Sequence, residues 1–245
     1  MTSPALTPPA PAAPAHDGRL QARAALYGNG ASAALALPVG IHKLAFPDQR
    51  QAVLYIPAQT GQPLPLLVLL HGARGQHGGA DAAALRYAVR EQVLLLIPEA
   101  RGTSWDMFRG GYGPDMDFLD QALRWVMRRH QVDADAITLA GFSDGASYAL
   151  SVGLMNGELF SDILAFSPGC MLPNARSASP RIFIGHGTGD AVLPVERGQS
   201  LARQLASEGY QVHYAEFDGG HLVPPAVAEA AFALIGQDDA SLPPA

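Results

Sequence analysis

Apolar positions in this chain follow two patterns that alternate along its length. Short, nearly continuous apolar runs, such as 64–70 and 93–97, have the length of strands that are covered on both faces. Segments such as 115–130 instead place apolar side chains three and four positions apart, which is the spacing of one helix face. The pattern predicts strands at 39–46, 51–56, 64–70, 93–97, 136–140, 163–166, 181–185 and 210–217. It predicts helices at 80–91, 115–130, 145–155, 195–207 and 223–235.

The alternation of strands and helices predicts an α/β fold, a mainly parallel twisted sheet with helices on both faces. With 245 residues, 48% of them hydrophobic, the chain suffices for one such domain, which we assign to 17–237. The Ala- and Pro-rich segment 1–16 is predicted to be a disordered tail, and 238–245 a frayed C-terminus. In such sheets functional sites lie at the carboxyl ends of the strands.

Composition and charge limit the classes of molecule that we expect this chain to bind. The chain has 16 Lys and Arg against 22 Asp and Glu, a net charge of −6, which argues against a nucleic-acid or membrane-surface protein. Its longest apolar runs are too short to cross a bilayer, and its single cysteine, Cys170, excludes an intramolecular disulfide. Segment 1–16 has neither the basic start nor the apolar stretch of a secretion signal, so we expect a cytoplasmic location. The oligomeric state stays open.

Gly141-Phe142-Ser143-Asp144-Gly145 matches the G-x-S-x-G pattern of a nucleophile turn. The match lies between a predicted strand and a predicted helix, the context that the pattern needs. A serine on such a sharp turn is held above the sheet at a helix N-terminus, and the two glycines leave room for the neighbouring backbone. We therefore predict that Ser143 is a nucleophile; the alternative is an N-cap serine in a tight turn.

A serine hydroxyl is a poor nucleophile unless a base accepts its proton. His221 follows the predicted strand 210–217 and is our candidate base, the alternative being an exposed loop histidine. The histidine needs a carboxylate that fixes its tautomer and stabilises the imidazolium. Asp190, which follows strand 181–185, is the first candidate; Asp218, three positions before His221, is the second.

The glycine-rich segment after strand 64–70 can supply an oxyanion hole. The amide of Ala73 and the amide of Asp144 are the predicted donors. The segment lacks the Gly-Lys-Ser/Thr ending of a phosphate-binding loop. His71, His77 and Asp81 could form a metal cluster, but their spacing fits no standard zinc pattern, so we expect neither a metal nor a cofactor.

Together, Leu69-Leu70-His71-Gly72, the turn 141–145, His186-Gly-Thr-Gly-Asp190 and Gly220-His221 resemble the α/β-hydrolase superfamily. Within it the sequence is similar to the phospholipase/carboxylesterase family, which is related to polyhydroxybutyrate-depolymerase and feruloyl-esterase-like enzymes. The resemblance covers about 64–235 and implies a catalytic triad of Ser143, Asp190 and His221. Two departures are Asp144, where the family often has Gln, and the absence of the disulfides of secreted relatives.

The resemblance also bears on substrate. In this fold a cap is usually inserted after the sixth strand, and here 167–180 is too short for one, which favours small to medium soluble esters. Four side chains are predicted to contact substrate: Trp105, Met107, Phe108 and Leu222. For Trp105 the alternative is a packing aromatic. Peptidase, amidase or thioesterase activity at the same triad, and a non-catalytic binding module, stay open as alternatives.

Overall fold

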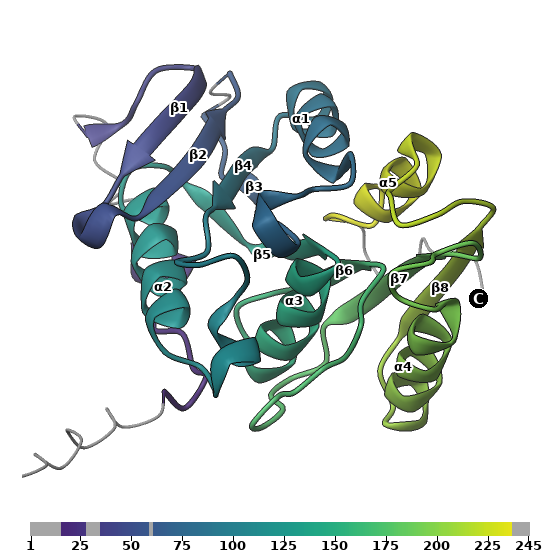
Figure 1. Cartoon of the computed structure of the whole chain (residues 1–245). Helices are drawn as coiled ribbons and strands as arrows, with labels where there is room; N and C mark the ends of the chain where they lie inside the picture. Colours follow the sequence, from purple (N-terminus) through teal and green to yellow (C-terminus); the bar gives the residue numbers. More distant parts are fainter. Residues whose placement is uncertain (1–15, 28–34, 59–60, 237–245) are drawn as a thin grey trace, which may run out of the picture.

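A computed structural model describes residues 16–27, 35–58 and 61–236, and an eight-stranded sheet forms its centre (Figure 1). The strand order is β1-β2-β4-β3-β5-β6-β7-β8. The first two strands pair antiparallel with their neighbours, and the pairs from β4 through β3 to β8 are parallel. The strands are β1 (Gly40–Ala45), β2 (Gln51–Ile56), β3 (Leu64–Leu70), β4 (Leu94–Pro98), β5 (Val132–Phe142), β6 (Asp162–Phe166), β7 (Arg181–Gly187) and β8 (Val212–Phe217).

Helices cover both faces of the sheet, which confirms the predicted fold class. They are α1 (Ala80–Glu91), α2 (Pro114–Met127), α3 (Asp144–Met155), α4 (Val195–Ser207) and α5 (Pro225–Phe232). One apolar core contains side chains of α2, α3 and α4, and a second contains those of α1 and α5. Alternate residues of β3 point into the two cores: Leu66 and Val68 into the first, Leu67 and Leu69 into the second. This explains the continuous apolar run of that strand.

Predicted and observed bounds agree for two strands and two helices. The bounds of β2, β3, α1 and α4 are as predicted. The largest difference is β5, predicted at 136–140, because its first residues carry Asp133 and Asp135. Val132 nevertheless pairs with Leu64, before a register shift, so backbone pairing extends the strand beyond its apolar part.

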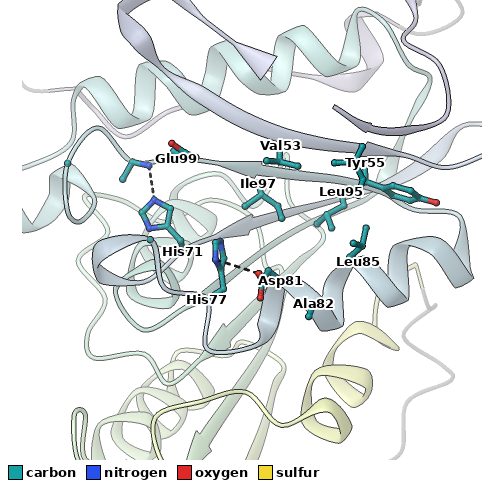
Figure 2. A pocket seen from close by; sticks show the side chains of 14 residues that line it. Val53, Tyr55, His71, His77, Asp81, Ala82, Leu85, Leu95, Ile97 and Glu99 are labelled. Carbon is teal, nitrogen blue, oxygen red and sulfur yellow. Dashed lines mark hydrogen bonds and ion pairs between the residues drawn. The ribbon is translucent and has the colours of Figure 1, made fainter. Parts of the chain in front are cut away.

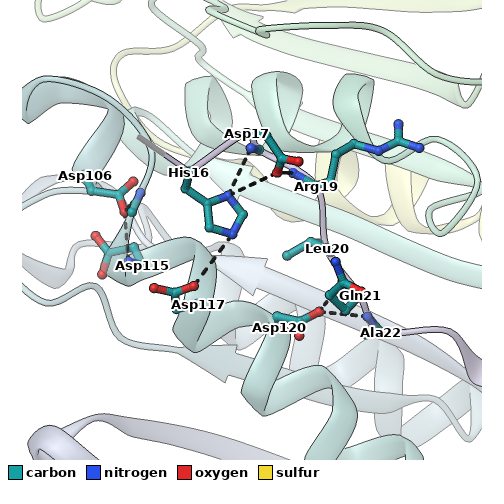
Figure 3. Close-up of polar contacts among 12 residues, drawn as sticks. His16, Asp17, Arg19, Leu20, Gln21, Ala22, Asp106, Asp115, Asp117 and Asp120 are labelled. Carbon is teal, nitrogen blue, oxygen red and sulfur yellow. Dashed lines mark hydrogen bonds and ion pairs between the residues drawn. The ribbon is translucent and has the colours of Figure 1, made fainter. Parts of the chain in front are cut away.

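Residues 16–22 run along α2 and are tied to it by polar contacts (Figure 3). Asp120 accepts hydrogen bonds from the amides of Gln21 and Ala22, at 2.6 and 2.7 Å. The amide of His16 donates to the carbonyl of Tyr112. His16 was assigned to the predicted tail; the rest of that tail, 1–15, and the predicted C-terminus 238–245 lie outside the described residues.

Two further features frame the site. The connection between β6 and β7 contains no helix, as expected of a fold without a large cap. No helix within the described part of the chain is long and apolar enough to cross a membrane.

Candidate active site

Ser143 lies on the sharp turn between β5 and α3, at the carboxyl end of the central strand. Its backbone has φ 56° and ψ −118°, a left-handed conformation that is strained for a residue with a Cβ. The Ser143 amide donates to the carbonyl of Phe166 at 2.8 Å, which holds the turn against β6. A side chain at Gly145 would meet the carbonyl oxygens of Leu70 and His71, so this position requires glycine. The surrounding strands therefore hold Ser143 in this strained backbone conformation.

His221 joins Ser143 to Asp190. Its Nε2 is 2.9 Å from the Ser143 Oγ, and its Nδ1 is 2.6 Å from the Asp190 Oδ2. A carboxylate only accepts hydrogen bonds, so Nδ1 carries the proton and Nε2 is free to accept one from the serine hydroxyl. The three residues, which are distant in sequence, form one chain of hydrogen bonds at the carboxyl ends of β5, β7 and β8.

Asp190 is held in place by the backbone that follows it. Its Oδ1 accepts hydrogen bonds from the amides of Val192 and Leu193, at 2.9 and 2.8 Å, which leaves Oδ2 for His221. Burial alone would raise the pKa of Asp190, but the amide of Leu193, the ring of His221 and the amide of Val192 lower it below its ordinary value. The side chain is fully buried and stays ionised at neutral pH.

Asp218, the competing candidate, does not take part in this chain. It is exposed, and no described residue makes a hydrogen bond or ion pair with its side chain. His221 instead packs its ring 4.7 Å from that of Phe142, which lies buried beneath the turn.

The predicted oxyanion loop, 72–75, passes directly beside Ser143. A Cβ on Gly72 would lie 3.0 Å from the Cβ of Ser143, so the two backbones are close. Neither the Ala73 amide nor the Asp144 amide donates a hydrogen bond to another described residue. Both are therefore available to a ligand atom above Ser143, and their role as oxyanion donors stays a prediction.

Residues 100–105, here called the brace loop, connect the oxyanion loop to the nucleophile turn. The Ala100 amide donates to the Nε2 of His71, and the Arg74 amide donates to the carbonyl of Thr103, at 2.8 and 2.6 Å. At the other end the Ser104 hydroxyl donates to the Asp144 carboxylate at 2.6 Å. The brace loop thus fixes the spacing between the two candidate amides. Sequence patterns did not indicate it, because each contact joins a side chain or amide to a distant segment.

The prediction that Trp105 and Met107 contact substrate is wrong. Trp105 is 0% exposed; its indole N–H donates to the carbonyl of His71, and its ring stacks on Tyr148 at 4.9 Å. It is a packing aromatic at the end of the brace loop, and Met107, at 6% exposure, belongs to the same core. Phe108 and Leu222 are 40% and 44% exposed, so both are free to contact a substrate and stay candidates.

Two histidines near the site have structural contacts. His71 donates from Nδ1 to the carbonyl of Gly72 and accepts at Nε2 from Ala100, so neither ring nitrogen is free to bind a metal. The described residues contain no group of three or more His, Cys, Asp or Glu side chains placed to hold a metal ion. His186, which begins the motif that contains Asp190 and to which the sequence assigned no role, is fully buried; its Nε2 donates to the carbonyl of Leu193 and lies 3.5 Å from the Asp190 Oδ2.

Comparison with known proteins bears out the resemblance. The family model described as Phospholipase/Carboxylesterase matches residues 115–231, which include Ser143, Asp190 and His221. A probable feruloyl esterase C of Aspergillus oryzae is 22% identical over 178 residues, which are 69% of this chain and 64% of that protein. The match therefore spans less than two thirds of that relative. Acyl-protein thioesterase 1 of Gibberella zeae is 30% identical over 101 residues, 37% of this chain and 43% of that protein.

Solved structures agree on the fold. The crystal structure of esterase PE8 superimposes with a TM-score of 0.61 at 23% identity, over 80% of this chain and 98% of that one. The described residues share the fold of that esterase, and their β6–β7 connection contains no helical cap.

Proposed function

We propose that this chain, an α/β-hydrolase fold similar to the phospholipase/carboxylesterase family over 115–231, is a serine hydrolase of carboxylic esters. The observation that carries the proposal is the hydrogen-bond chain from Ser143 Oγ through His221 to Asp190, with distances of 2.9 and 2.6 Å. This arrangement is what an acyl-transfer site needs: a nucleophile, a base of defined tautomer and a buried carboxylate.

The first half of the reaction forms an acyl-enzyme. His221 Nε2 accepts the proton of Ser143 as its Oγ attacks the ester carbonyl, and Asp190 stabilises the resulting imidazolium. The amides of Ala73 and Asp144 stabilise the oxyanion, each contributing roughly 3 kcal/mol to lowering the barrier. His221 then gives its proton to the leaving alcohol, which departs as the C–O bond breaks.

The second half repeats these roles with water. His221 accepts a proton from a water molecule, whose oxygen attacks the acyl carbon. The tetrahedral intermediate collapses to release the carboxylic acid, and Ser143 regains its proton from His221. Every proton in the cycle passes through Nε2, so no metal or cofactor is required by the scheme.

The substrate class follows from the open site. The β6–β7 connection contains no helix, and the exposed side chains of Phe108 and Leu222 offer apolar contacts. We propose small to medium soluble esters, including aryl-substituted acyl groups of the kind that the name of the Aspergillus oryzae relative implies. Thioester hydrolysis is the second candidate, because the acyl-protein thioesterase match supports it. Amide hydrolysis is less favoured, because it depends on extended contacts with the substrate. A cap would provide such contacts, and the β6–β7 connection contains no helix that could form one.

The direct test replaces Ser143 by Ala. Only one oxygen is lost, so the fold should persist while kcat on p-nitrophenyl butyrate falls by roughly 10⁴- to 10⁶-fold. Ser207→Ala, an exposed serine at the end of α4, is the matched control and should keep full activity. Retention of a tenth of the wild-type kcat by folded Ser143→Ala protein would remove the nucleophile assignment.

A substrate panel separates the alternatives. The wild type is assayed on the p-nitrophenyl ester, the thioester and the p-nitroanilide of one acyl group. Ester rates far above anilide rates are expected. A faster thioester reaction would move the assignment to a thioesterase, and no turnover of any of the three, with no labelling by a fluorophosphonate, would leave a binding module.

A further inference from the structure

A cavity of about 690 Å³ lies outside the triad, between α1 and the face of β2 and β4 (Figure 2). None of the triad residues lines it. Its wall does include His71 and Gly75 of the segment that carries the oxyanion loop, and Ala100 and Gly102 of the brace loop. We call it the α1 pocket. Its volume is in the range of pockets that bind small organic molecules, about 300–1,000 Å³.

One end of the α1 pocket is apolar. Val53, Tyr55 and Ile97 are half-buried on the strands, and Leu85 faces them from α1 (Figure 2). In the described residues α1 is the helix that packs on this face of β2 and β4, and it covers these side chains only in part. Burying them against a hydrocarbon group would stabilise a complex, because apolar surface is removed from water.

The other end of the α1 pocket is acidic. Asp81, in the first turn of α1, and Glu99, just after β4, both line it, and no Lys or Arg is among the described residues that do. Among the described residues, the carboxylate of Glu99 makes no ion pair. That of Asp81 has only His77, whose Nδ1 is 4.0 Å away.

His77 does not neutralise these carboxylates. Burial lowers the pKa of His77 below its ordinary value, although Asp81 acts in the opposite direction, so the ring is neutral at pH 7. Its Nε2 is buried and has no hydrogen-bond partner in the described residues. The polar end therefore offers two carboxylates and a neutral imidazole, which suits a cationic donor and disfavours an anion.

We propose that the α1 pocket binds small apolar amines, with the hydrocarbon group against Val53, Ile97 and Leu85 and the ammonium group between Asp81 and Glu99. The site is independent of the proposed ester hydrolysis, because no triad residue contributes to it. The α1 pocket lies behind the oxyanion loop and the brace loop, so an amine bound in it contacts both loops.

The test is a binding titration of the full chain at pH 7, followed by two-dimensional amide NMR, with three ligands of one chain length: hexylamine, hexanol and hexanoate. Hexylamine should bind saturably and shift the amides of His77, Asp81 and Gly102. Hexanol should bind more weakly, and hexanoate should not bind. Hexanoate or hexanol binding as tightly as hexylamine would overturn the assignment of the ligand class.

Two variants locate the site. Asp81→Asn should weaken hexylamine while leaving hexanol unchanged; Asp135→Asn, the same charge change at an exposed position near the amino end of β5, should alter neither. Ala82→Trp, at an exposed position of α1 that lines the cavity, should fill the pocket and abolish binding of both ligands without lowering the melting temperature. Unchanged hexylamine binding in either pocket variant would overturn the site. Because the readout is binding, failure of the amine-binding proposal leaves the esterase proposal unaffected. Failure of the esterase proposal likewise leaves the amine-binding proposal unaffected.

Discussion

Asp190→Asn tests the orientation of the base, because the geometry dictates which way the new amide must lie. In the wild type, Oδ1 accepts two backbone hydrogen bonds, from Val192 and Leu193, while Oδ2 accepts one from His221. An asparagine has one acceptor oxygen, and keeping the two backbone bonds places it at the Oδ1 position. The NH₂ group then faces His221 Nδ1, which must become an acceptor, so the ring proton moves to Nε2 and the base can no longer accept from Ser143.

The size of the effect follows from the cost of the opposite orientation. Turning the amide so that its oxygen faces His221 leaves the N–H groups of Val192 and Leu193, whose hydrogen bonds are part-buried, without acceptors, at about 1–3 kcal/mol each. The total of about 2–6 kcal/mol makes the productive orientation roughly 30- to 25,000-fold rarer. Loss of the carboxylate charge also removes the electrostatic stabilisation of the His221 imidazolium. We expect kcat to fall by about 10³- to 10⁴-fold, the magnitude measured when a triad aspartate becomes asparagine.

The assay is steady-state hydrolysis of p-nitrophenyl butyrate by the two variants Asp190→Asn and Asp218→Asn. KM should change little in Asp190→Asn, because this side chain is fully buried and does not reach substrate. Asp218→Asn, the control, should change kcat only a few-fold, because the exposed side chain has no polar partner among the described residues. The reasoning fails if Asp190→Asn keeps kcat within tenfold of the wild type, or if Asp218→Asn is the more damaging change.

Three further predictions concern stability. In Gly145→Ala the new methyl group meets the carbonyl oxygens of Leu70 and His71, so the melting temperature should fall, by an overpacking cost of about 1–3 kcal/mol, and activity should fall with it. Asp115→Asn removes the buried partner of Arg50, 2.7 Å away, and should lower the free energy of unfolding by about 3–5 kcal/mol in urea titrations. Burial of His130 lowers its pKa in the folded state, so the unfolded state binds the proton more readily; stability should fall as the pH drops below the ordinary histidine value of about 6.5, and less so in His130→Gln.

Each of these has its own check. Asp117→Asn, two positions along α2 from Asp115 and 74% exposed, should leave stability nearly unchanged. An equal loss in both aspartate variants would contradict the buried ion pair. For His130, urea midpoints at pH 7.5 and 5.5 are compared; an identical shift in wild type and variant would mean that other groups carry the acid sensitivity.

The local sequence determined those elements whose own residues show which of their faces are buried. The run 64–70 has the length and the nearly continuous apolar character of a strand covered on both faces, and the structure confirms that strand. The turn at Ser143 was equally readable, because Gly141 and Gly145 form a short local pattern that leaves room for the backbone packed against this turn. Polar residues at the start of β5 hid its true length, since pairing with β3 depends on backbone groups that carry no sequence signal.

Only the tertiary structure decided which distant groups meet. Asp190 lies 31 residues from His221 and Asp218 only three, yet Asp190 makes the 2.6 Å contact, because β7 and β8 are neighbours and their carboxyl ends converge. Trp105 could have been a pocket wall or a core residue, since an aromatic ring on a loop satisfies either role. Its burial follows from the carbonyl of His71, in the segment after β3, and from the ring of Tyr148 in α3. A sequence records which groups a residue can offer, whereas the partner that it finds depends on how the strands are ordered in the sheet.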